Sequence, residues 1–171
     1  MKLKTTEKGF TLIELVVGIA IAAVIVGAAS MTVVTMMRLT PQTNNWAIAL
    51  RQVQNAGHWI SRDVQMSQGN IDIDPDPATF LTLTQPKNPT DNKTIVYQFE
   101  DMGDGLQRLT RNNQADGEQI MIAEYISIDN NDTTASYNSD NRTLNFTITA
   151  ISGDVPPVTR DYEAMQRVPS P

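Results

Sequence analysis

The chain has 171 residues, a formal net charge of -6 and no cysteine. This length fits one modest domain together with an anchor segment, and the lack of cysteine excludes both a disulfide framework and thiolate chemistry. An acidic chain is a poor non-specific partner for DNA or for anionic lipid, so we expect no direct nucleic-acid binding.

The N-terminal region joins a short basic segment to a long apolar run. Residues 1–9 carry three lysines and one glutamate, and residues 10–37 hold a single charged residue, Glu14. The apolar run exceeds the ~20 residues that a transmembrane helix needs, and the basic segment favours a cytoplasmic N-terminus. A carboxylate inside such a run is costly in lipid, which makes Glu14 a candidate functional residue.

The junction Lys8-Gly9-Phe10-Thr11-Leu12-Ile13-Glu14-Leu15 resembles the class III signal of type IV prepilins and type II secretion pseudopilins. The resemblance implies that residues 1–9 are a leader peptide, that a prepilin peptidase cuts between Gly9 and Phe10, and that the new amine of Phe10 is methylated. Removal of the leader would change the formal net charge from -6 to -8. The resemblance also implies an assembly role for Glu14, whose carboxylate would pair with the methylated amine of a neighbouring subunit.

Residues 38–69 predict the second half of the same helix. Trp46, Leu50, Val53, Gly57, Ile60 and Val64 recur at spacings of four and three, which is the apolar stripe of an amphipathic helix. Pro41 can kink the helix or mark a break, and Gly69 is a plausible C-terminal stop. We therefore expect a transmembrane or filament-core helix over residues 10–37 that continues as an amphipathic helix.

Residues 70–155 predict a small antiparallel sheet. Short runs rich in Ile, Val, Thr, Tyr and Phe are separated by turn-forming stretches, and the runs are Thr79–Thr84, Thr94–Glu100, Leu106–Arg111, Gln119–Ile128 and Thr143–Ile151. Residues 156–171 are rich in proline and are expected to be an irregular tail. The predicted fold class is α+β, with a long N-terminal helix packed on the sheet, which is the architecture of type IV pilins.

The soluble half carries a second resemblance. Arg62-Asp63, late in the amphipathic helix, is followed by Ile95-Val96-Tyr97 and then by two Leu-x-Arg triplets, Leu106–Arg108 and Leu109–Arg111. This order is similar to J-type minor pseudopilins of type II secretion and to W-type minor pilins of type IV pili.

The sequence offers little for catalysis or for metal binding. His58 is the only histidine, so a Ser-His-Asp set would need it; we expect an ordinary packed or surface histidine and no enzyme activity. Asp72, Asp74 and Asp76 alternate like the start of a calcium loop, but Pro77 and Leu83 stand where an EF-hand needs Gly and Glu. These aspartates stay calcium candidates in an irregular loop, with Asp129 and Asp132 as a second pair, against solvated acidic loops; no other cofactor is expected.

These features together predict a minor pilin or pseudopilin, placed at the tip of the filament or in assembly priming. It would sit in the inner (cytoplasmic) membrane by a single span, with its head outside, and then enter an extracytoplasmic filament. Its partners would be the prepilin peptidase, other pilin or pseudopilin subunits, the inner-membrane assembly platform and the membrane itself. The alternatives are a major pilin and, from a different class, a signal-anchored extracytoplasmic sensor or binding domain.

Overall fold

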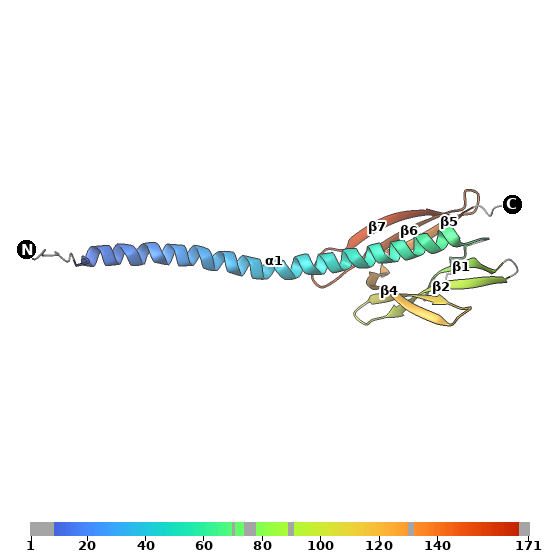
Figure 1. The fold of residues 1–171 in the computed structure, drawn as a ribbon, viewed down its shortest axis with the longest axis horizontal. Helices are drawn as coiled ribbons and strands as arrows, with labels where there is room; N and C mark the ends of the chain where they lie inside the picture. The colour runs from blue at the N-terminus through green and yellow to red at the C-terminus, as the bar shows by residue number, and fades with distance from the viewer. Residues whose placement is uncertain (1–8, 70, 74–77, 89–90, 130–131, 168–171) are drawn as a thin grey trace, which may run out of the picture. The chain divides into compact units, whose positions relative to one another are not determined.

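The computed structural model describes residues 9–69, 71–73, 78–88, 91–129 and 132–167. These described residues form one long helix followed by seven strands (Figure 1). It divides into two compact units, residues 1–41 and 42–171. We call the first the stem and the second the head.

Helix α1 runs from Leu12 to Met66 and contains Pro41. The hydroxyl groups of its stem half do not need water, because they donate to the carbonyl four residues earlier: Ser30 to Val26 and Thr35 to Met31. Backbone and side-chain polar groups are thus satisfied within the segment, as a helix in lipid requires. By length and composition α1 is able to cross a membrane.

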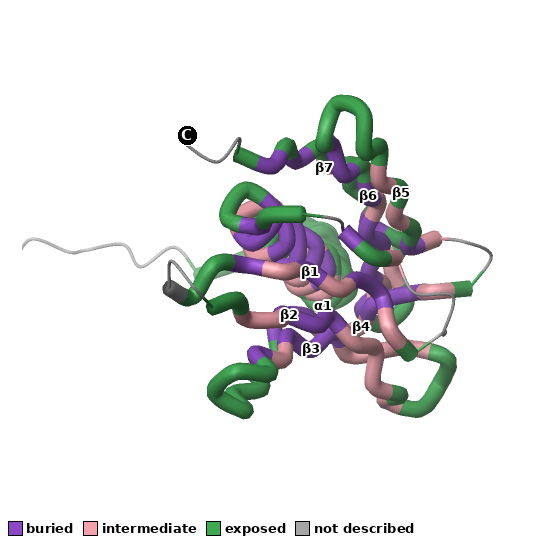
Figure 2. The backbone as a smooth tube through the Cα atoms, turned by 90° about the vertical axis from the view of Figure 1, so that its right-hand side faces the viewer, coloured by how far each residue is buried: buried purple, intermediate pink, exposed green. Residues whose placement is uncertain are grey.

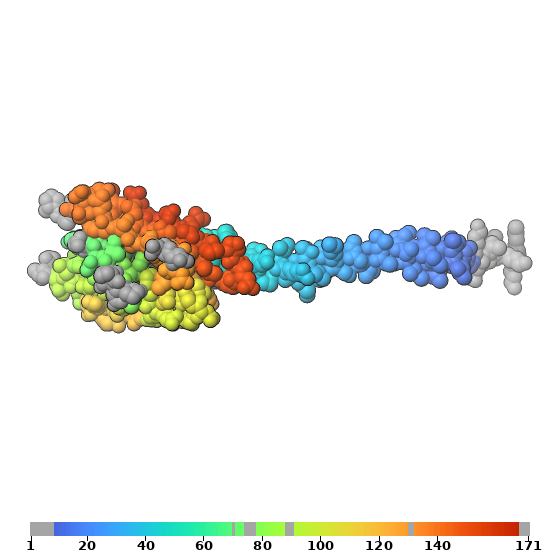
Figure 3. Space-filling model, turned by 180° about the vertical axis from the view of Figure 1, so that it is seen from behind, coloured from blue at the N-terminus to red at the C-terminus, as the bar shows by residue number. Residues whose placement is uncertain are grey.

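The described residues of the stem are exposed, and those from Leu12 onward are helical. Every described residue from Gly9 to Asn44 is exposed, and the exposed side chains include large apolar ones such as Ile19, Val24 and Met31. Figure 3 draws this segment in blue as a single column of side chains. An apolar surface of this extent is stable only against lipid or against other apolar helices.

The head contains all seven strands. They are β1 (Thr79–Asn88), β2 (Asp91–Asp101), β3 (Leu106–Asn113), β4 (Glu118–Ser127), β5 (Thr134–Asn138), β6 (Thr143–Ala150) and β7 (Val158–Met165). All pairings are antiparallel, in the order β1-β2-β3-β4-β6-β5, with β7 on β6. The register of β4 with β6 is a single pair, Ile126 with Ala150, and the Ile151 amide beside it donates to the Tyr125 carbonyl at 2.8 Å, so the β1–β4 and β5–β7 parts of the sheet share a short junction.

The core of the head lies between the last half of α1 and the sheet. The helix contributes small and β-branched side chains, and the strands contribute larger ones; the fully buried members include Ala49, Val53, Ile60, Leu81, Tyr97, Ile126 and Ile148. Figure 2 shows buried stretches of α1, β2, β3 and β6 gathered in the interior. The stripe predicted from spacing is therefore the buried face of the helix at Val53, Gly57, Ile60 and Val64, whereas Trp46 is 47% exposed.

The expected α+β architecture is confirmed, and three details differ from the prediction. Residues 156–171 are not an irregular tail throughout, because Val158–Met165 form strand β7 along the whole of β6. Strand β5, Thr134–Asn138, lies inside a stretch predicted as turn. The helix ends at Met66, three residues before Gly69, although Gly69 has the positive φ of 81° that suits glycine after a helix.

Candidate functional site

The first candidate site is the start of α1, which carries the junction that the sequence predicts to be processed. Gly9 and Phe10 precede the helix and are exposed, and no atom lies within 4 Å of where a Cβ on Gly9 would be. A peptidase needs an accessible segment outside regular structure. The chain thus presents the Gly9–Phe10 bond in a form that a protease can reach.

Glu14 forms a capping box with Thr11. Its Oε2 accepts hydrogen bonds from the Thr11 backbone amide at 3.0 Å and the Thr11 hydroxyl at 2.8 Å, and its own amide donates to Thr11 Oγ1 at 3.3 Å. With Leu12 as the first helical residue, Thr11 is the N-cap and Glu14 the third helical position. Sequence reasoning missed this role, although the Thr-x-x-Glu spacing is its usual signal.

The capping box orients the carboxylate towards the N-terminus of its own helix. In this chain residues 1–9 precede Phe10, so the nitrogen of Phe10 is a peptide amide without charge. Phe10 therefore cannot form an ion pair with Glu14 before cleavage. Glu14 itself is exposed. Its carboxylate is therefore held at the helix start, beside Phe10, where an incoming cationic group would meet it.

The second site is a buried charged cluster in the head. Asp63 on α1 is fully buried, and its Oδ2 accepts hydrogen bonds from the Tyr97 hydroxyl at 2.7 Å and from Arg111 Nε at 2.5 Å. Arg62 lies 3.6 Å from the other carboxylate oxygen and stacks over the Trp59 ring at 4.0 Å. The cluster therefore ties the helix to strands β2 and β3.

Burial and the charge of Asp63 shift the pKa values of Tyr97 and Arg111. Burial, with the Asp63 carboxylate beside it, raises the pKa of Tyr97 well above its ordinary value. Burial alone would lower the pKa of Arg111, but the hydrogen bond and charge of Asp63 outweigh it and raise that pKa. The tyrosine stays neutral and the arginine stays charged at neutral pH, so the cluster is an ion pair with a neutral hydroxyl donor.

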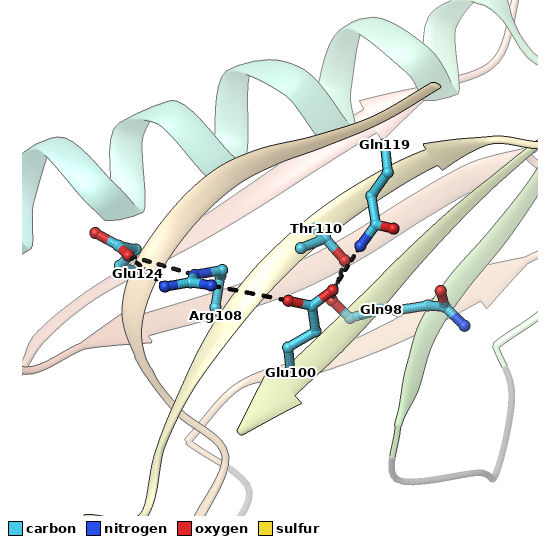
Figure 4. Close-up of polar contacts among 6 residues, drawn as sticks. All are labelled: Gln98, Glu100, Arg108, Thr110, Gln119 and Glu124. Atoms are coloured by element: carbon cyan, nitrogen blue, oxygen red, sulfur yellow. Dashed lines mark hydrogen bonds and ion pairs between the residues drawn. The ribbon is translucent and has the colours of Figure 1, made fainter. Parts of the chain in front are cut away.

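The Arg62-Asp63, Tyr97 and Arg111 positions that carried the second resemblance are thus brought together. The arginine of the other triplet, Leu106–Arg108, does not join this cluster and contacts different residues. Arg108 contacts Glu124 at 3.1 Å and Glu100 at 4.0 Å across strands β2–β4 (Figure 4). Its side chain is 40% exposed, as is typical of a solvated pair that adds little stability.

The candidate catalytic and calcium-binding residues do not come together in the described part of the chain. His58 is exposed on the helix. Asp72 is exposed and bridges to Thr82 through its backbone, while Asp74 and Asp76 lie outside the described residues. Asp132 accepts a hydrogen bond from Ser127 at 2.9 Å, and Asp129 is exposed. Within the described part of the chain, no group of three or more His, Cys, Asp or Glu side chains could hold a metal ion.

Comparison with known families bears on the first site. Residues 4–30 match the family model described as "Prokaryotic N-terminal methylation motif". Searches of curated proteins and of solved structures found no match. The matched segment contains Gly9, Phe10 and Glu14, and this motif is typical of type IV pilins and pseudopilins. Combined with the pilin-like α+β fold, it makes the chain a type IV pilin-like protein, of a kind that is typically structural and not enzymatic.

Proposed function

We propose that the chain is a minor pilin or pseudopilin, a membrane-anchored subunit of a type IV pilus or a type II secretion pseudopilus. The observation that carries the proposal is the methylation motif at the start of an exposed apolar helix that ends in a folded head. The stem holds the subunit in the inner membrane with its head outside. The assembly platform then extracts it, and stems bundle into the filament core.

In this proposal the prepilin peptidase cuts between Gly9 and Phe10 and methylates the new amine. The carboxylate of Glu14 then pairs with the methylated amine of a neighbouring subunit, which sets the axial register of the two stems. Neither charge is tolerable alone in an apolar core, so pairing favours the docked arrangement. The capping box supports this step, because it already turns the carboxylate towards the helix start.

A place at the tip or in assembly priming is the finer part of the proposal. Its support is the resemblance of the head to J-type and W-type minor subunits, and the Asp63, Tyr97 and Arg111 positions of that pattern form one buried cluster. A quantitative count of subunits in sheared filaments separates this role from that of a major pilin. A minor subunit is present at a small fraction of the main subunit, whereas a major pilin makes up most of the filament mass.

Processing is the direct test of the proposal. Coexpressed with a prepilin peptidase, the chain should lose residues 1–9 and gain one methyl group on Phe10, as intact-mass and N-terminal peptide analysis would show. A bulky substitution such as Gly9→Leu should block the cut, while Gly9→Ala should be tolerated or only slowed. An uncleaved wild-type chain, or a cut beyond residue 20, would exclude a pilin and leave a signal-anchored binding domain as the better reading.

A further inference from the structure

The head has a polar cavity that neither processing nor assembly of the stem uses. It has a volume of about 270 Å³ and lies between the residues that follow α1, the β5–β6 turn and the end of β7. These three segments are far apart in the sequence but lie at the same end of the head (Figure 1). The volume lies just below the range of about 300–1,000 Å³ for drug-sized ligands, so it suits a smaller ligand of about one sugar residue.

The floor of the cavity is organised by Gln166. This side chain is 5% exposed; its Nε2 donates to the Ser67 hydroxyl at 2.9 Å and to the Gly69 carbonyl at 3.0 Å, and its Oε1 accepts from the Tyr137 hydroxyl at 2.8 Å. One amide thus fixes groups from three segments in a single arrangement. Such a preformed polar floor lowers the cost of ordering when a ligand binds.

Two arginines are among the residues that line the cavity, and we call them the rim arginines. Arg142 and Arg167 both line the cavity and are exposed, and among the described residues neither forms an ion pair. Their backbones are fixed, because the Arg142 carbonyl accepts from the Gln166 amide at 3.0 Å and the Arg167 amide donates to the Gln65 carbonyl at 3.4 Å. The chain therefore places two cationic residues in the lining of one small cavity.

The local charge is opposite to that of the head as a whole. Residues 42–171 carry 17 acidic and nine basic residues, yet no described residue that lines this cavity is Asp or Glu. The guanidinium groups are also not needed to cap α1. Its last carbonyls already accept hydrogen bonds: Asp63 from Gln85, Val64 from Ser67, and Gln65 from the Arg167 amide.

We propose that this cavity binds a single acidic sugar residue, a uronic acid. The two arginines match a carboxylate, for which the guanidinium fork is suited. The hydroxyls of Tyr137 and Ser139 and the floor around Ser67 match the ring hydroxyls, while the polar lining disfavours an apolar ligand. The head would then hold an acidic polysaccharide, and this binding goes beyond the proposed role of a filament subunit and does not depend on it.

The test uses the full chain in detergent micelles and two probes that differ only at C6. Methyl β-D-glucuronide carries a carboxylate, and methyl β-D-glucoside carries a neutral hydroxymethyl group. Titration calorimetry at about 150 mM salt, where long-range attraction is screened, should show saturable binding of the glucuronide and binding of the glucoside weaker by about tenfold or more.

Variants locate the site. Arg142→Gln and Arg167→Gln should each weaken glucuronide binding by about tenfold, whereas Arg160→Gln, an exposed arginine on β7 that does not line the cavity, should leave it unchanged. Circular dichroism should show that all three variants stay folded. The proposal is overturned if the two sugars bind equally, if neither binds saturably, if the rim variants bind like wild type, or if inorganic phosphate displaces the glucuronide at equal concentration.

Discussion

Asp63 and Glu14 are two carboxylates on one helix that are stabilised in different ways. Asp63 is fully buried and has its charged and hydroxyl partners within its own chain. Among the described residues, Glu14 is exposed, accepts hydrogen bonds only from Thr11 and forms no ion pair. Asp63 thus has charged partners inside the head, although its Oδ1 accepts no hydrogen bond from a described residue, whereas Glu14 has only a neutral neighbour.

At the residue scale, the Asp63 cluster predicts a loss of stability at alkaline pH. The pKa of Tyr97 is raised in the fold by burial and by Asp63, so above about pH 10 the unfolded chain releases protons that the folded chain retains. The stabilising contribution is complete below the unfolded pKa and falls as the pH rises towards the folded pKa. Denaturant unfolding at pH 8, 10 and 11 should show this decline. Between the unfolded and the folded pKa, the free energy of unfolding should fall by about 1.4 kcal/mol per pH unit for each such tyrosine.

The variant Tyr97→Phe separates this effect from other alkaline changes. It should cost about 1 kcal/mol at pH 8, because Asp63 loses one hydrogen bond, and it should flatten the alkaline decline. Some decline should remain, since burial also raises the pKa of Tyr162. A variant with an alkaline decline as steep as that of wild type would show that Tyr97 does not couple to folding.

Gly57 permits a close contact between α1 and strand β7. A Cβ on this residue would lie 2.2 Å from Cζ of Tyr162, and the Tyr162 hydroxyl donates to the Val53 carbonyl at 3.1 Å. Gly57→Ala should therefore destabilise the head by about 1–3 kcal/mol, despite the higher helix propensity of alanine. Gly18→Ala is the matched control, because nothing lies within 4 Å of that position; equal denaturant midpoints for the two variants would contradict the tight contact.

At the element scale, the head is one core made by a helix and a sheet that cannot be separated. Residues Ala49, Val53, Ala56, Ile60 and Val64 of α1 are fully buried against the strands. Without them the sheet would expose one apolar face, and the short junction of β4 with β6 would have no helix across it.

Two fragments test this dependence. A fragment of residues 70–171 should be poorly folded, with little dispersion in its proton–nitrogen NMR spectrum and no cooperative melting. A fragment that starts at Gln42, the first residue of the head, should be soluble and melt cooperatively. Cooperative melting of the shorter fragment would mean that the helix is not part of the core.

How far sequence predicts this fold depends on the strength of the local pattern. The stripe from Val53 to Val64 is buried as its spacing predicts, because helical periodicity repeats over several turns. Strand β7 was missed because its residues are mostly polar and prolines flank it; only pairing with β6 along its length makes it a strand. β5 is short and lies among Asn and Asp residues, so turn propensity outweighed its Ala-x-Tyr alternation.

The candidate sites also differ in how far the sequence predicts them, because one is a local motif and the others join distant residues. Gly9, Phe10 and Glu14 form a contiguous motif, so the family match and the sequence reasoning concern the same residues. The Asp63 cluster and the cavity around Gln166 join residues 34 to 99 positions apart, and no local signal reports such contacts. Arg62-Asp63 was noticed as a pattern, but its partners Tyr97 and Arg111 are assigned only by the fold.

At the scale of the whole molecule, stem and head contribute different kinds of surface. The stem is apolar and exposed along its length, with Gly18 and Gly27 open on all sides. Small residues allow helices to approach closely in lipid. The head is acidic and buries its own core. In the proposed subunit, the attraction that holds a filament together would therefore come from the stems, where Glu14 is the only charged side chain of residues 10–37.

Glu14→Gln and Glu14→Ala together test this assembly step, because they separate capping from charge. Glutamine keeps an oxygen that can accept the Thr11 hydrogen bonds of the capping box, whereas alanine removes both the cap and the charge. Membrane insertion should persist in both variants, since the apolar run loses its one charged residue. Cleavage should also persist, because Gly9 and Phe10 are unchanged.

Incorporation into filaments is the step that should fail, and it should fail equally in both variants. A neighbour's methylated amine would enter the apolar core without a counter-charge, at a cost of about 3–5 kcal/mol. The measurement follows each variant from the membrane fraction to the sheared-filament fraction beside wild type. If glutamine restores incorporation and alanine does not, the carboxylate acts as a helix cap and not as the docking charge, because a neutral acceptor is then sufficient.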